Sequence, residues 1–348
     1  MRRITLKYAQ PGLVLGLPVY GAGGEELLPH NTTLDDECIT LLTRAGVTEI
    51  FILDSRVADV IVTPMFAPEM ESGLGGAFRR LLADRRGKML QRTNIEQLHL
   101  AISRMVDSLH RNVLGQMDLS CAVSQRDYAA LQPVKAAQLA MGIGHKMGMS
   151  SNELAIAGMA AVLKDISLTD PAMREDTPGF RDHPAGSAEI LRQSGLAGTV
   201  VDTVLQHHEH WNGSGYPRGL KGDQIGRLAQ VVTIADSLSD LTAERPGRGR
   251  YMSHEAMEYI MAYSGEDFSP KLVEFVVRHV PSYPNGLMVQ LNSGEIAIVS
   301  NPNLGFIARP MVRVCWDPEK GRLTRPYDLD LKQSELQRKL IVKVMEYD

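Results

Sequence analysis

Residues 206–225 read QHHEHWNGSGYPRGLKGDQI, and they combine two features that point to a binding site. The first part gathers three histidines and a glutamate, and neutral imidazoles beside a carboxylate suit a divalent metal ion. The second part holds four glycines and Pro217, in a turn where backbone can approach a ligand closely. Trp211 and Tyr216 add flat faces for stacking. A helix end with solvated histidines before a surface turn is the simpler alternative, but so dense a group favours a site.

Apolar residues recur at helical spacing on both sides of this stretch. Such periodicity is typical of helices that bury one face, and Gly or Pro separates neighbouring segments. The sequence therefore predicts a mainly α protein, a bundle in which polar ligands point inward from several helices. The expected helices cover residues 94–114, 128–147, 151–165, 184–194, 199–208, 227–243 and 254–262.

Smaller units are expected at both ends of the bundle. The N-terminal α+β domain should contain a strand within 13–20, a helix over 34–45 and a buried strand over 47–53. Prolines and glycines within 60–92 indicate a linker with a basic helical tail, which leads into the long helix. Alternating apolar runs near the C-terminus predict a small β subdomain. The expected domains are residues 1–60, 61–119, 120–283 and 284–348.

The composition describes a globular protein without a nucleic-acid partner. The 348 residues are 44% apolar and 22% charged, and a formal net charge of −4 offers no basic surface to a polyanion. The three cysteines lie far apart, which argues against a disulfide framework and for a reducing compartment. No window approaches the roughly 20 apolar residues of a membrane span. We therefore expect a cytoplasmic protein.

The spacing H-H-E-x-x-x-G-x-G-Y-P-x-G-L-x-G-x-x-I over residues 207–225 resembles the signature of the HD-GYP family of bacterial signalling proteins. That family is a helical branch of the HD metal-dependent phosphohydrolases, and its members hydrolyse cyclic di-GMP. The resemblance is strongest over residues 120–348. It implies an HD-type helical bundle around two or three metal ions, usually iron, which polarise the phosphate and activate a water molecule.

The resemblance also assigns the metal ligands. Asp165 matches the aspartate of the HD pair, His183 matches the histidine of an H-P dipeptide, and His207 and His208 match the tandem pair. Asp236 matches the late aspartate of the family. It stands in an otherwise apolar helix, where a buried carboxylate needs a partner.

Four positions depart from the family pattern. Lys164 stands where the family has the histidine before Asp165, and Gln132 stands at the position of an early histidine. An ammonium group has no lone pair, so Lys164 cannot be a metal ligand. Leu168 replaces a lysine that meets the substrate phosphate, and Asn212 replaces the aspartate before the turn.

These departures leave two states of the centre open. In the first, a single iron or manganese ion lies between Asp165 and the three matched histidines. In the second, no metal binds, and the Lys164 ammonium neutralises Asp165 or Asp236 instead. Both states exclude an intact binuclear centre, so metal is expected at reduced stoichiometry or not at all.

The favoured hypothesis is a signalling protein with little or no catalytic activity, which binds cyclic di-GMP or a partner protein such as a GGDEF-type cyclase. Binding needs shape, donors and stacking faces, whereas hydrolysis also needs metal. The alternative is a metal-dependent cyclic di-GMP phosphodiesterase with a reduced metal site, in which Asp165 and Lys164 act in catalysis. A phosphohydrolase of another phosphoester ranks third, because the G-Y-P turn indicates the cyclic dinucleotide branch. The substrate-binding candidates are Trp211, Gly215, Tyr216, Pro217 and Arg245.

Overall fold

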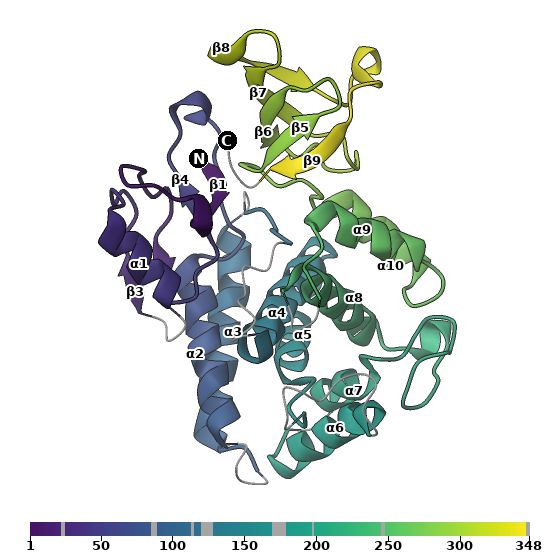
Figure 1. The fold of residues 1–348 in the computed structure, drawn as a ribbon. Helices are drawn as coiled ribbons and strands as arrows, with labels where there is room; N and C mark the ends of the chain where they lie inside the picture. Colours follow the sequence, from purple (N-terminus) through teal and green to yellow (C-terminus); the bar gives the residue numbers. More distant parts are fainter. Residues whose placement is uncertain are drawn as a thin grey trace.

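The chain folds around a helical bundle, with a small α+β unit beside it and a five-stranded sheet at one end (Figure 1). The mainly α fold class is therefore confirmed. Among the described residues, no helix is both long and apolar enough to cross a membrane. The computed structural model describes residues 1–21, 25–84, 89–112, 115–119, 128–168, 179–196, 198–244 and 248–345.

The bundle's largest hydrophobic core lies among closely packed helices. Helices α4, α5 and α8 meet at its centre, where small residues allow close approach. A Cβ atom at Gly158 on α5 would lie 2.9 Å from Sδ of Met141 on α4, so a larger residue there would displace the Met141 side chain. The bundle helices are α2 (Pro68–Asp84), α3 (Arg92–Arg111), α4 (Tyr128–Lys146), α5 (Ser151–Leu163), α6 (His183–Gln193), α7 (Thr199–Gln206), α8 (Arg227–Thr242), α9 (Ser253–Ala262) and α10 (Pro270–His279).

The ends of α5 determine where its functional residues lie. The helix begins after Ser150, whose hydroxyl accepts from the Glu153 backbone N–H while the Glu153 carboxylate accepts from the Ser150 N–H. It ends at Leu163, two residues before the predicted end. Lys164 and Asp165 therefore stand in the turn that follows the helix.

Helix α2 corrects the prediction of a linker over residues 60–92. Pro68 begins the helix, where a missing N–H costs nothing. Leu74, Phe78 and Leu81 lie on one face and are buried in the bundle core. Glycines in this segment indicated a linker, but Gly75 lies inside the helix, where a Cβ would make only ordinary contact with Leu131 of α4, at 3.5 Å. Burial of the apolar face outweighs the low helix propensity of glycine.

The N-terminal unit has its own core and two short antiparallel strand pairs. Strand β1 (Arg2–Thr5), which the sequence pattern did not indicate, pairs with β4 (Glu49–Ile52), the predicted buried strand. Strand β2 (Val19–Tyr20) is shorter than the predicted strand over 13–20 and pairs with β3 (Glu26–Leu28). Helix α1 (Asp36–Arg44) begins two residues after the predicted start, because the Asp35 carboxylate accepts from the Cys38 N–H at 2.7 Å and caps the helix there.

The C-terminal sheet is antiparallel, with strand order β8-β7-β6-β5-β9. Strands β5, β6 and β7 follow the predicted apolar segments. The sequence pattern did not indicate β8, which is largely polar, or β9, which is apolar apart from Lys343. The strands are β5 (Met288–Leu291), β6 (Ile296–Asn301), β7 (Met311–Asp317), β8 (Gly321–Asp330) and β9 (Ile341–Met345).

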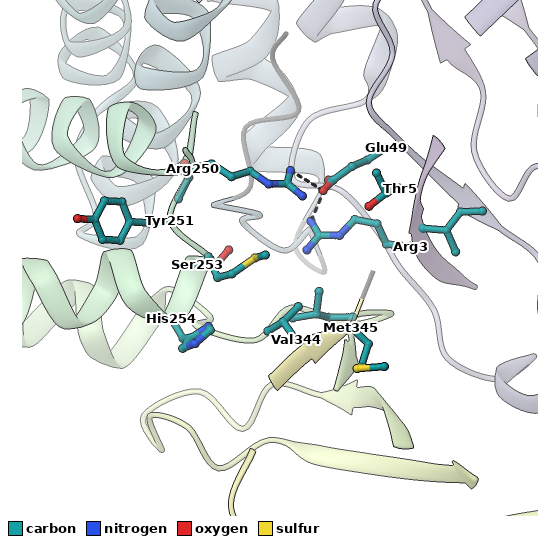
Figure 2. A pocket seen from close by; sticks show the side chains of 13 residues that line it. Arg3, Thr5, Glu49, Arg250, Tyr251, Ser253, His254, Val344 and Met345 are labelled. Carbon is teal, nitrogen blue, oxygen red and sulfur yellow. Dashed lines mark ion pairs between the residues drawn. The ribbon is translucent and has the colours of Figure 1, made fainter. Parts of the chain in front are cut away.

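A charged cluster joins the N-terminal unit to the bundle. Glu49 of β4 pairs with Arg250, which precedes α9, at 2.7 Å, and with Arg3 of β1 at 3.6 Å (Figure 2). The Glu49 side chain is 9% exposed, so little water can replace either partner.

Replacing Glu49 with glutamine should lower the free energy of unfolding by about 2 kcal/mol, because two guanidinium groups lose a buried anionic partner. Denaturant unfolding of purified protein measures the change. The matched control is Glu274→Gln on α10, whose pair with Arg278 is largely exposed and should change stability by less than about 0.5 kcal/mol. Equal effects at the two positions would contradict this role for Glu49.

Candidate metal centre

Four side chains from consecutive parts of the bundle converge at one point. Each of Asp165, His183, His207 and His208 offers a ligand atom, and these atoms all lie within 4.8 Å of one another. Asp165 follows α5, His183 begins α6, and the histidine pair follows α7. His183 and His207 are buried, whereas Asp165 and His208 are partly exposed, so the cluster is reached from their side.

Backbone carbonyls fix the orientation of the two buried imidazoles. His183 Nδ1 lies 2.6 Å from the Phe180 carbonyl oxygen, and His207 Nδ1 lies 2.6 Å from that of Val204. A carbonyl oxygen only accepts, so each Nδ1 carries the hydrogen and each Nε2 keeps its lone pair. Such a backbone contact is the usual support for a metal-binding histidine.

The two Nε2 atoms face each other across 3.2 Å. They also lie 3.3 and 3.5 Å from Oδ1 of Asp165. Two lone pairs and a carboxylate oxygen at this separation repel one another unless a proton or a metal ion lies between them. This donor set therefore fits one divalent ion, since imidazole suits iron and zinc and carboxylate suits harder ions such as manganese.

His208 completes the cluster as a neutral ligand candidate. Burial, with the neighbouring His207 and His183, holds the pKa of His208 well below its usual range. Its ring stacks on Tyr216 at a centroid distance of 4.8 Å. The imidazole is thus kept unprotonated and held in place from one side.

Lys164 lies where the family resemblance places ligands of a second metal ion. Its side chain is 2% exposed, and its ammonium group pairs with Oδ2 of Asp165 and, at 3.0 Å, with Oδ1 of Asp236. Burial would lower the pKa of Lys164, but the two carboxylates outweigh it and raise the pKa. Burial would likewise raise the pKa of Asp165, but Lys164 and the facing histidines hold it well below its usual range. The Lys164 ammonium group is therefore a cation between two carboxylates.

Gln132 of α4 completes this polar network. Its Nε2 donates to Oδ1 of Asp236 at 2.8 Å and to Oγ of Ser239 at 2.9 Å. Asp236 therefore lies with Lys164 and Gln132, outside the four-ligand group that includes Asp165. An ammonium group and an amide N–H₂ surround its carboxylate with donors. This half of the centre does not fit a second metal ion.

The glycine-rich turn is fastened to the histidine segment by buried polar contacts. The Glu209 carboxylate, 1% exposed as a residue, accepts from the backbone N–H groups of Arg218 and Leu220, both at 2.8 Å. The Tyr216 N–H donates to the His208 carbonyl at 3.0 Å. A Cβ at Gly215 would lie 2.4 Å from that same carbonyl oxygen, so only glycine fits there.

The substrate-binding candidates differ in where they lie. Tyr216 adjoins the cluster through His208, whereas Gly215 packs against backbone and Pro217 is exposed. Trp211 is partly buried, and its backbone N–H donates to the Asp267 carbonyl at 3.1 Å. Arg245 lies outside the described residues.

Arg181 was not among the candidates, although it lies beside the cluster. It belongs to the short 3-10 turn before α6, is exposed, and places its guanidinium carbon 5.4 Å from the centre of the Tyr216 ring. Its position two residues before the H-P dipeptide is the one sequence feature that could have indicated a role near the cluster. The contact between Arg181 and Tyr216 depends on the fold, because these residues are far apart in the sequence.

A helical bundle that gathers aspartate and histidine from successive helices defines a protein of the HD type. A model of the HD domain family matches residues 77–272, more than half of the chain, and the chain belongs to this family. This match confirms the predicted relationship to the HD family. The fold is also similar to that of Bd1817, a HDG"Y"P protein from Bdellovibrio bacteriovorus, with a TM-score of 0.51 at 14% identity over 79% of this chain and 97% of that chain.

Two curated relatives carry the name cyclic di-GMP phosphodiesterase. PA4108 of Pseudomonas aeruginosa is 28% identical over 61% of this chain and 55% of its own length. The response regulator RpfG of Xanthomonas campestris is 28% identical over 65% of this chain and 62% of its own length. The chain thus matches somewhat more than half the length of each relative.

Proposed function

We propose that this protein binds cyclic di-GMP as a signalling ligand and hydrolyses it slowly or not at all. The observation that carries the proposal is the buried Lys164 ammonium group between Asp165 and Asp236. A fixed cation there neutralises the carboxylates that would otherwise hold a second metal ion. The names of the relatives supply the cyclic dinucleotide as the ligand.

The remaining donor set would hold one iron or manganese ion, through Asp165, His183, His207 and His208. Such an ion supplies Lewis acidity and lowers the pKa of a bound water molecule. Lys164 supplies one positive charge in place of a second divalent ion. Unlike a metal ion, an ammonium group cannot bind a water molecule or a phosphate oxygen as a ligand. The loss of that electrostatic stabilisation raises the barrier to hydrolysis by several kcal/mol.

Ligand binding depends on groups that the substitutions leave in place. Tyr216 offers a partly exposed ring beside the cluster, and the Glu209 contacts hold its loop in one shape. The Arg181 guanidinium lies next to the same ring and can meet a phosphate. These groups support recognition of a phosphate joined to a base, whether or not the phosphodiester bond is cleaved.

A phosphodiesterase with a single metal ion is the second candidate. The orientation of the His183 and His207 Nε2 atoms toward Asp165 favours it, because a metal ion between these atoms would be well stabilised. The two candidates differ in turnover. A direct test incubates the protein with cyclic di-GMP and manganese or iron, with PA4108 as the active reference, and separates the products by chromatography.

Under our proposal, calorimetry detects binding of cyclic di-GMP while the linear dinucleotide and GMP accumulate at least ~100-fold more slowly than with PA4108. Turnover at the rate of the reference would establish the second candidate. An absence of both binding and turnover would contradict both candidates and favour a protein partner, such as a GGDEF-type cyclase, as the ligand of this surface.

Arg181→Ala should weaken cyclic di-GMP binding by roughly tenfold, because a charge-assisted contact to phosphate is lost. Arg192→Ala is the control, since Arg192 lies on the exposed face of α6 and pairs with Glu189. Titration calorimetry on both variants measures the difference. Equal affinities in the two variants would exclude Arg181 from the phosphate contact.

A further inference from the structure

A second cavity lies where the N-terminal unit meets the bundle, and it shares no lining residue with the histidine cluster. Figure 1 shows the N-terminal unit alongside α2. The cavity volume is about 350 Å³, which is large enough for a small organic ligand. Apolar side chains from both sides line it, and the following ones remain partly exposed: Leu17, Val19, Val47, Phe51 and Leu131. A ligand with an apolar body would remove this surface from water.

Two charged side chains line the cavity from the bundle helices. Glu71 lies on α2 and Lys135 on α4, and both are partly exposed. Residues three or four positions apart on a helix share a face. Leu131, Val134 and Gln138 of α4 line the cavity at this spacing from Lys135 and from one another. Lys135 therefore belongs to the face of α4 that borders the cavity.

The other charged residues that line the cavity are already paired. Arg3 pairs with Asp118 at 3.0 Å and with Glu49 at 3.6 Å. Glu49 also pairs with Arg250 at 2.7 Å. Two guanidinium groups thus meet two carboxylates, and these pairs bring no excess charge to the cavity.

Lys135 differs from these residues. Within the described parts of the chain, its ammonium group forms neither an ion pair nor a hydrogen bond. Burial raises the pKa of Glu71, and the charge of Lys135 offsets this only in part. Glu71 is therefore near Lys135 without neutralising it as a paired carboxylate would. A cation in this position, beside apolar walls, suits a ligand that is negatively charged at one end.

We propose that this cavity binds a small organic carboxylate with an apolar body. The carboxylate pairs with Lys135, and the apolar body covers the exposed parts of Val47, Phe51 and Leu131. The ligand contacts both the N-terminal unit and α4, the helix that carries Gln132 to the metal centre. The cavity is thus a second ligand site, placed where two parts of the fold meet.

Two probes of nearly equal shape, 2-naphthoate and 2-naphthamide, test the charge of the ligand. Titration calorimetry with the full chain at pH 7 should detect binding of 2-naphthoate. The uncharged 2-naphthamide should bind at least ~10-fold more weakly, because it lacks the charge that Lys135 meets. Failure of 2-naphthoate to bind, or equal binding of the two probes, would overturn the proposal.

Lys135→Met tests where the probe binds. Methionine nearly conserves the side-chain volume, so the affinity for 2-naphthoate should fall roughly tenfold while that for 2-naphthamide stays the same. Lys135→Arg keeps the charge and should retain most of the affinity for 2-naphthoate. The control, Lys146→Met, makes the same chemical change at an exposed position at the end of α4 and should leave both affinities unchanged. Undiminished binding of 2-naphthoate by Lys135→Met, or an equal loss in Lys135→Arg, would overturn the role of the Lys135 charge.

Discussion

Lys164→Met is expected to lower the free energy of unfolding of chelator-treated protein by about 3 kcal/mol at pH 7. Methionine nearly conserves the side-chain volume, so packing changes little. The loss comes from Asp165 and Asp236, which keep their charges and lose the cation between them. Urea unfolding of the parent and the variant measures the difference. Because both carboxylates retain some exposure, we expect the lower end of the range for broken buried pairs.

The pH dependence of this difference separates charge from packing. In the parent, the pKa of Asp165 is lowered, so its contribution is present above about pH 4 and is lost below it. The pKa of Lys164 is raised, so its contribution is present below about pH 10 and is lost as the pH rises further. The pair therefore stabilises the fold between these limits.

Without the ammonium group, burial and the neighbouring carboxylate should raise the pKa of Asp165 in the variant. As the pH falls from 7 towards 4.5, this carboxylate becomes protonated in the variant and its unfavourable charge is removed. The difference in the free energy of unfolding between parent and variant then becomes smaller. A difference that stays constant over this range would mean that Lys164 acts through packing alone.

The double variant Gln132→His, Lys164→His should bind a second metal ion. It replaces an amide donor and an ammonium group beside Asp236 with two imidazoles that can ligate. Metal content should rise from at most one ion per chain to two, and cyclic di-GMP hydrolysis should rise at least ~100-fold. Elemental analysis and product chromatography on the same preparation measure both.

Gln132→His alone is the matched control for this experiment. It keeps Lys164, so its metal content should stay at that of the parent. Two ions in the single variant would show that the ammonium group does not block the second position. No gain in the double variant would contradict the prediction that imidazoles at positions 132 and 164 complete a second metal site with Asp236.

The sequence was most informative where function depends on local spacing. The tandem histidines, the H-P histidine and Asp165 were assigned from motif positions, and the structure brings all four together. Lys164 was expected to pair with one of two aspartates and contacts both. That second contact depends on how α8 packs against α5, which no local pattern encodes.

Other features depended on contacts between distant segments. Glycines suggested a linker where the chain forms α2, because the sequence pattern does not show how deeply the apolar face of this segment is buried against the bundle. Arg181 and Tyr216 are neighbours only in the fold.

The metal content of the parent protein tests the central claim most directly. The claim is that the Lys164 ammonium group takes the place of one ion. Protein purified without chelator, in medium supplied with iron and manganese, is analysed by inductively coupled plasma mass spectrometry. We predict at most one ion per chain, and two ions per chain would contradict the claim.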